Sequence, residues 1–261
     1  MSNITINKVR KPASTLFAGV NAKRVSMLTL LFAVLSLVFF LLLVFLRIDF
    51  APYPLMSYQD AIDNLTPLIL IPIYWLLFRY ATDGASNLAE EMAFVVLAGF
   101  WVEGQGMHLA ANSISNLMEN LAHDQVINIT GTDIFSLTYF YDEVLGHYLR
   151  DIGLLGLAAL LIYREWRRPA GVATTWWAAI LGGVIYGFTY FCLFLEGQTV
   201  ALGLPFALVV VLFALVRGRR SLAQRPVLAF FFIACLLAFL LFAGWGLYWG
   251  GFPEFSEVGL I

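Results

Sequence analysis

The feature that most constrains this chain is the run MLTLLFAVLSLVFFLLLVFL at positions 27–46, which contains no charged side chain. A helix needs about 20 apolar residues to cross the hydrocarbon core of a bilayer, and this run has that length. Similar runs recur along the chain, which is 61% hydrophobic and only 12% charged, with a mean hydropathy of +0.84. A soluble domain carries about 25% charged residues. The sequence therefore predicts an all-α fold, a polytopic integral membrane helix bundle.

Seven segments are long and apolar enough to be transmembrane helices. They lie at residues 27–46, 60–80, 87–117, 137–165, 174–196, 201–217 and 227–249. Pro67 and Pro72 fall inside the second segment, where they should kink or break the helix. The expected organisation is one transmembrane domain, residues 25–250, between a polar N-terminal tail of residues 1–24 and a C-terminal tail of residues 251–261.

Basic residues mark one side of this predicted bundle. They precede the first segment, join the fourth to the fifth and join the sixth to the seventh: Lys8, Arg10, Lys11, Lys23, Arg24, Arg164, Arg167, Arg168, Arg217, Arg219, Arg220 and Arg225. The other loops carry acids, among them Asp49, Asp63 and Asp133. The positive-inside rule then predicts a cytoplasmic N-terminus and an extracytoplasmic C-terminus, in a bacterial inner membrane or an equivalent membrane.

The third segment carries an unusual group of polar side chains in the stretch WVEGQGMHLAANS, residues 101–113. Gln105, His108 and Asn112 follow one another at helical spacing and should share one face. Glu103 is about 140° away from His108 on an ideal helix. It would join that face only if the backbone bends, which the neighbouring Gly104 would permit.

The fourth and fifth segments bring further ionisable groups to the same level of the membrane. Glu143 and His147 are one helical turn apart, Arg150 follows one turn later, and Asp142 should point to a neighbouring helix. Glu196 ends the fifth segment. Ionisable groups inside membrane helices usually mark function. Segments three, four and five are therefore expected to form a polar cavity near the extracytoplasmic face.

The residue types in this cavity favour a metal site. Imidazole and carboxylate are ligands for zinc, iron, manganese and copper. We expect His108, His147 and Glu143 to bind the metal, and Gln105, Asn112 and Asp142 to orient them. Glu143, Glu103 and Glu196 are the candidate catalytic carboxylates. The leading hypothesis is a metal-dependent membrane enzyme, a hydrolase or an oxidase, that acts on a lipophilic or periplasmic small molecule.

Three alternatives compete with the metal enzyme. His108 and His147 would be the axial ligands of a b-type haem, with Arg150 near a propionate, but acids beside both histidines suit a cation better. A proton-coupled transporter would use the same acids, but the apolar stretch at residues 93–100 interrupts a polar path. Finally, the polar groups would simply lock helices together in an accessory subunit of a larger membrane complex. Membrane lipid is the expected environment in every case, and the net charge of −2 gives no basic field for nucleic acid.

Overall fold

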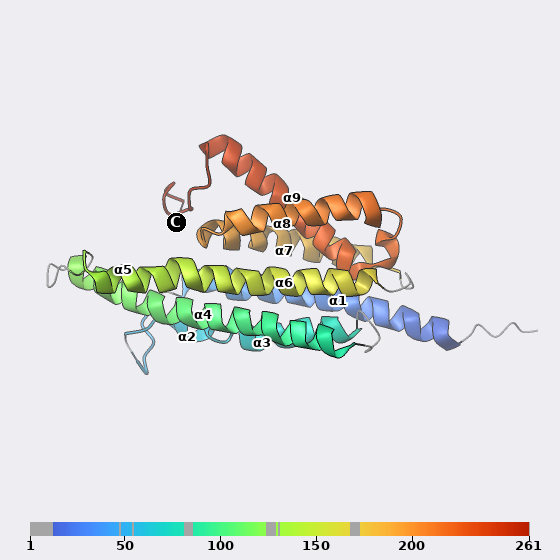
Figure 1. Cartoon of the computed structure of the whole chain (residues 1–261), viewed down its shortest axis with the longest axis horizontal. Helices are drawn as coiled ribbons and strands as arrows, with labels where there is room; N and C mark the ends of the chain where they lie inside the picture. The colour runs from blue at the N-terminus through green and yellow to red at the C-terminus, as the bar shows by residue number, and fades with distance from the viewer. Residues whose placement is uncertain are drawn as a thin grey trace, which may run out of the picture.

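The computed structural model describes residues 13–46, 48–53, 55–80, 86–123, 129, 131–167 and 173–260. All regular elements in these ranges are helical, apart from an isolated bridge between Asp49 and Ser57 (Figure 1). They are α1 (Ala13–Phe40), η1 (Leu42–Phe45), α2 (Tyr58–Asp63), α3 (Thr66–Tyr80), α4 (Leu88–His123), α5 (Asp133–Tyr139), η2 (Phe140–Gly146), α6 (His147–Trp166), α7 (Trp176–Glu196), α8 (Val200–Phe213), η3 (Ala214–Gly218), η4 (Leu222–Gln224) and α9 (Pro226–Trp249).

Six helical segments of the described chain are long and apolar enough to cross a membrane, which is typical of a multi-pass membrane protein. They are Lys23–Phe40, Tyr58–Tyr80, Asp133–Trp166, Trp176–Glu196, Val200–Gly218 and Pro226–Trp249. These six agree with six of the seven predicted segments. The other predicted segment is α4, a continuous helix of 36 residues that does not reach the same apolarity. Glu103, Gln105 and His108 in its middle account for that difference.

The helix boundaries differ from expectation in two places. The first helix already begins at Ala13, so residues 13–24 of the predicted tail are helical and continuous with the first span; residues 1–12 lie outside the described chain. The second predicted segment is divided into α2 and α3 at the turn just before Thr66 and Pro67. Proline disfavours helical backbone at the preceding residue but is tolerated in the first turn of a helix. Pro72 lies inside α3 without ending it.

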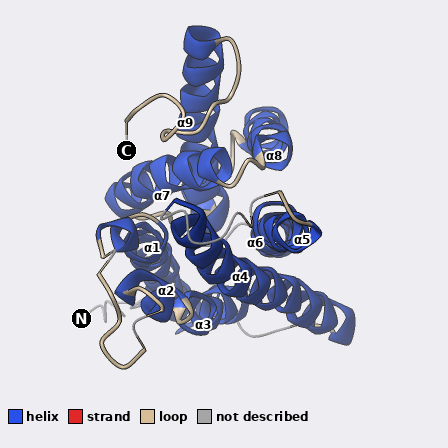
Figure 2. Cartoon of the chain, turned by 90° about the vertical axis from the view of Figure 1, so that its left-hand side faces the viewer, coloured by secondary structure: helices blue, strands red, loops and turns tan. Residues whose placement is uncertain are grey.

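Glycines set how closely the helices approach each other. The most extensive contacts join α4 to α6, α7 to α9 and α1 to α7 (Figure 2). A Cβ atom added at Gly104 would lie 2.5 Å from the carbonyl oxygen of Gly146, and one at Gly153 would lie 2.6 Å from the backbone nitrogen of Trp101. The α4 and α6 backbones therefore touch along a line of glycines, as small residues allow in membrane helix bundles.

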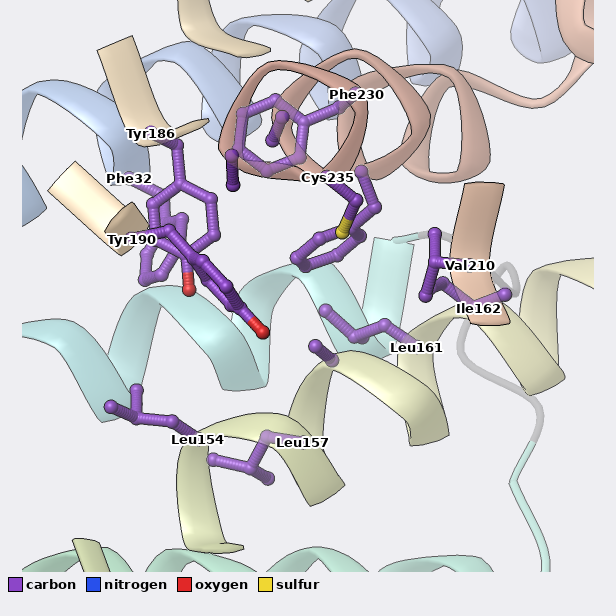
Figure 3. Close-up of a cluster of buried hydrophobic side chains, with 14 of the residues drawn as sticks. Phe32, Leu154, Leu157, Leu161, Ile162, Tyr186, Tyr190, Val210, Phe230 and Cys235 are labelled. Carbon is purple, nitrogen blue, oxygen red and sulfur yellow. The ribbon is translucent and has the colours of Figure 1, made fainter. Parts of the chain in front are cut away.

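An aromatic cluster forms the centre of the core between α1, α3, α7 and α9. The rings of Phe32 and Tyr74 meet edge to face at 4.6 Å, and Tyr186 stacks on Phe230 at 5.6 Å. Figure 3 shows Tyr186, Tyr190 and Phe230 gathered around Phe32, with Cys235 beside them. Edge-to-face and stacked pairs at these distances are the favourable arrangements of aromatic quadrupoles. This core fixes the helices on which the polar end of the bundle is built.

The two ends of the bundle differ in charge. At one end, which we call the basic end, Arg164 forms an ion pair with Glu90 at 3.7 Å. Glu165 accepts hydrogen bonds from the backbone N–H groups of Val227 and Leu228 and so caps the start of α9. The exposed Arg217, Arg219 and Arg220 lie at the same end, which is on the right in Figure 1. The opposite end carries the acids and histidines singled out in the sequence.

Candidate functional site

A histidine–aspartate pair joins α4 to the segment that precedes α6. His108 lies 2.7 Å from Asp142, measured from Nδ1 to Oδ1. Asp142 is buried and His108 is partly buried. An ionised carboxylate only accepts hydrogen bonds, so with Asp142 in that form the Nδ1 atom of His108 is the donor and its Nε2 atom faces away from this bond. Asp142 therefore points to a neighbouring helix, as the helical spacing predicts, and orients this imidazole.

The π-helical segment η2 places two neighbouring acids on different partners. Asp142 contacts His108 on α4, whereas Glu143 approaches the Nδ1 atom of His147 with Oε2 at 3.6 Å. The wider turn of a π-helix is uncommon and recurs at functional sites. Sequence spacing places Glu143 and His147 one turn apart, and the structure keeps them adjacent despite the altered turn.

The second histidine is held by the link between α7 and α8. The Nδ1 atom of His147 donates to the carbonyl oxygen of Gly197 at 3.1 Å, because a carbonyl only accepts. Its ring contacts the ring of His108, with 4.4 Å between the centroids. In the same link Gln198 has a φ of 51°, a left-handed conformation that non-glycine residues rarely adopt. The two imidazoles therefore meet between two uncommon backbone conformations, the π-helical segment η2 and the left-handed residue Gln198.

A buried ion pair lies about one helical turn after His147 on α6, toward the basic end. The Nε atom of Arg150 donates to Asp151 Oδ1 at 2.8 Å, and the hydroxyl of Thr199 donates to the other carboxylate oxygen. All three side chains are buried, and the Nη2 atom of Arg150 has no hydrogen-bond partner among the described residues. Asp151 and Thr199 were missed in the sequence; the signal was an acid next to Arg150 in an apolar helix.

Gln105 connects the site to the start of the second span. Its Nε2 atom donates to Asp63 Oδ2 at 3.1 Å, and the Asp63 carboxylate also accepts from the hydroxyl of Thr66. Asp63 lies within electrostatic range of His108 and Arg150. The Oε1 atom of Gln105 is buried without a partner in the described chain. The sequence counted Asp63 among the loop acids and not among the site residues, because its contact with Gln105 joins segments far apart in the sequence.

Three predicted site residues take other positions. Glu103 is exposed on the outer face of α4, because the helix continues through Gly104 without turning that face inward. Asn112 accepts a hydrogen bond from Asn116 one turn further along the same helix. Glu196 accepts from the backbone N–H of Phe255 at 2.7 Å. The backbone of α4 is continuous at Gly104, so Glu103 stays on a different face from His108, as ideal helical spacing predicts.

The C-terminal segment, residues 250–260, folds back over the same end of the bundle. The indole of Trp245 donates to the carbonyl oxygen of Pro253 at 3.0 Å, and Gln198 donates to Glu254. The Glu254 side chain lies within electrostatic range of Glu143. This segment is therefore attached to the link between α7 and α8, next to the polar site.

The expected metal ligands gather but do not converge on one point. Within the described residues, no group of three or more His, Cys, Asp or Glu side chains is placed to hold a metal ion. The reason is visible at His147, where Glu143 approaches the Nδ1 atom that already donates to Gly197. The direct contact between the rings of His108 and His147 also leaves no space for a haem between them.

Comparison with known proteins assigns no family to the chain. No family pattern matches it, and neither a curated protein nor a solved structure is significantly similar. The function therefore has to be argued from the site itself.

Proposed function

We propose that the chain is a seven-helix membrane enzyme with an acid–base site near the extracytoplasmic face. The seventh crossing in this proposal is α4, which packs along α6 over its length. The gathering of Arg217, Arg219 and Arg220 at the basic end supports a cytoplasmic position for that end and for the N-terminus. The histidines at the opposite end then face the extracytoplasmic side.

The proposed catalytic unit is His108 with Asp142. A carboxylate that accepts from Nδ1 fixes the tautomer in which Nε2 is the base, which is the arrangement used in many hydrolases. In the proposed step Nε2 would take a proton from an attacking water, and a protonated Glu143, next along the chain, would give its proton to the leaving group as the bond to that group breaks. The proton on His108 would then pass to Glu143, which restores both groups. The His108–Asp142 distance of 2.7 Å between two different helices is the observation that carries this proposal.

The unpartnered buried polar atoms suggest how a substrate would bind. In folded proteins nearly all buried polar groups find a hydrogen-bond partner, so an exception calls for an explanation. The Nη2 atom of Arg150 is a donor suited to a carboxylate, phosphate or carbonyl oxygen, and Gln105 Oε1 is an acceptor. We propose a lipophilic or periplasmic ester or amide whose polar group enters beside these two atoms.

The test uses the purified protein in liposomes with a panel of fluorogenic lipophilic esters and amides. His108→Ala and Asp142→Asn should each lower kcat/KM by about 10²–10⁴-fold, the usual contribution of a positioned base. Asn112→Ala is the matched control on the same helix and should keep full activity. Equal activity in all variants, or loss of activity only together with loss of thermal stability, would contradict the catalytic role.

A metal-dependent form of the same enzyme is the second candidate. Both imidazoles donate through Nδ1 to protein oxygen atoms, and metal-binding histidines typically use one nitrogen in this way while the other binds the ion. His108, His147 and Glu143 would hold the ion after a change in the Glu143 side chain. Elemental analysis should then give stoichiometric zinc, iron, manganese or copper, lost in His108→Ala and His147→Ala but kept in Asn112→Ala.

A structural role as an accessory subunit is the third candidate, because the bonds of the site cross between helices. Gln105 binds Asp63, and His108 binds Asp142. In that case His108→Ala would lower thermal stability, while the protein would show neither turnover nor bound metal. Turnover of the ester and amide panel, bound metal and thermal stability, measured on the same variants, therefore separate the three candidates.

A further inference from the structure

The outward face of α4 presents large apolar side chains such as Val95, Val96 and Val102, but one stripe of it has an unusual composition for a surface in contact with lipid. Gly99, Glu103, Gly106 and Ala110 follow one another at four-three-four spacing, and all four are exposed. This spacing puts them on one face of the helix. Glu103 forms no hydrogen bond or ion pair with any described residue.

The exposed faces of other helices show what this protein presents to lipid. On α7 these positions are Ile180, Leu181, Val184 and Phe188, all large and apolar. A Cβ atom at Gly99 or at Gly106 would meet nothing within 4 Å. The packing of the chain itself therefore does not require glycine at these two positions.

Glu103 lies at a depth where an exposed carboxylate is expensive. Glu90 marks the basic end through its ion pair with Arg164. A rise of 1.5 Å per residue puts Glu103 about 20 Å along α4 from Glu90. The hydrocarbon core is about 30 Å thick, so Glu103 falls in its outer part. Ionisable side chains at such depth almost always face a protein partner or water.

We propose that this face binds a transmembrane helix of a different protein, one that carries Lys or Arg at the level of Glu103. Glycines on both sides of Glu103 let a second backbone come close, as in other membrane helix pairs. The carboxylate then pairs with the basic side chain in the absence of water. This inference depends on the membrane position of α4 and is independent of the acid–base site.

Charge complementarity decides against a second copy of the same chain as the occupant. The exposed basic residues of the described chain are Lys23, Arg24, Arg79, Arg167, Arg217, Arg219 and Arg220. They lie at the basic end of the bundle, away from the level of Glu103. A second copy in the same orientation would therefore bring another carboxylate to Glu103, but no exposed cation of the described ranges. In Figure 2, α4 runs from the middle of the bundle toward its edge, between α3 and α6.

The experiment measures energy transfer in liposomes between the labelled full-length protein and two synthetic transmembrane peptides. One is a leucine–alanine helix with a single lysine in its outer third, and the other has leucine at that position. The lysine peptide should bind the unaltered protein about tenfold more tightly, a difference expected for one polar contact between membrane helices. Glu103→Gln should abolish the difference, and Gly106→Leu should weaken binding of the lysine peptide.

The matched control is Glu119→Gln, which alters an exposed acid on the same helix beyond the hydrocarbon core and should keep the difference. Equal binding of the two peptides, or a difference unchanged by Glu103→Gln, would overturn the proposal. Self-association of the protein that is lost in Glu103→Gln would also overturn it, because the occupant would then be a second copy. Melting temperatures of the variants, measured in parallel, show whether a loss of binding reflects misfolding.

Discussion

Gly104→Ala should separate α4 from α6 and disturb the site that they share. The added Cβ atom would lie 2.5 Å from Gly146 O and 2.9 Å from Arg150 Cα, and closer still to Arg150 N. These are backbone atoms, so no side-chain rotation relieves the contact. An ordinary van der Waals contact of about 3.5 Å requires the helices to move apart by about 1 Å at this level.

The size of the effect follows from two opposing contributions. Overpacking against rigid neighbours costs about 1–3 kcal/mol, and alanine recovers about 1 kcal/mol through its higher helix propensity. A separation of about 1 Å also stretches the 2.7 Å bond between His108 and Asp142 beyond hydrogen-bonding distance. Loss of a bond to a charged group adds about 1.5–3 kcal/mol. The free energy of unfolding should therefore fall by about 1.5–5 kcal/mol.

Thermal unfolding of the detergent-purified protein checks this prediction against two glycines of the same helix. Gly99→Ala and Gly106→Ala meet no atom within 4 Å and should leave stability unchanged or raise it slightly. The Cβ atom of Gly156→Ala meets the side chain of Leu97, which is able to move. The stability of this variant should therefore lie between those of Gly104→Ala and Gly106→Ala. If Gly104→Ala is as stable as Gly106→Ala, close backbone packing of α4 on α6 does not hold the site together.

Three further substitutions test buried polar contacts. Arg150→Leu leaves the Asp151 carboxylate without its cation and should lower the free energy of unfolding by about 3–5 kcal/mol. The loss should be smaller in the double variant that also carries Asp151→Leu, which a double-mutant cycle of unfolding free energies measures. Glu165→Gln weakens the two bonds that cap α9 and should lower the free energy of chemical unfolding by about 1–2 kcal/mol. Trp245→Phe removes the bond to Pro253 and should speed hydrogen exchange in the C-terminal segment, measured by mass spectrometry, with the helices unaffected.

The helical architecture could be predicted because membrane spans are a matter of length and apolarity. Six predicted segments coincide with helices that meet both conditions. The break between α2 and α3 was harder to locate, because Pro67 and Pro72 both interrupt the pattern and only Pro67 lies at a helix start. Whether a proline interrupts a helix depends on where the preceding turn falls, and tertiary contacts determine the place of that turn.

The site could be predicted in part because helical periodicity fixes which residues of one helix share a face. Helical spacing correctly pairs Glu143 with His147, since i, i+4 neighbours share a face, and the order of the predicted spans brings His108 to the same level. It also placed Glu103 on a separate face, and the bend that would have joined it to His108 is absent because Gly104 is used for packing. Asp63, Asp151 and Gly197 join the site through contacts between segments far apart in sequence, which periodicity along one helix does not reveal.

The π-helical turn at η2 bears on the choice between a functional and a structural site. Every backbone polar group in a membrane must be satisfied internally, and an α-helix does this with the best hydrogen-bond geometry. The other π-helical segment of the described chain, η3, lies at the end of α8, whereas η2 runs directly into α6. A structural network needs only one acid facing α4, which a regular helix provides. The segment η2 carries both acids, with Asp142 in contact with His108 and Glu143 beside His147, and two acids beside two histidines suit proton transfer better than simple attachment of helices.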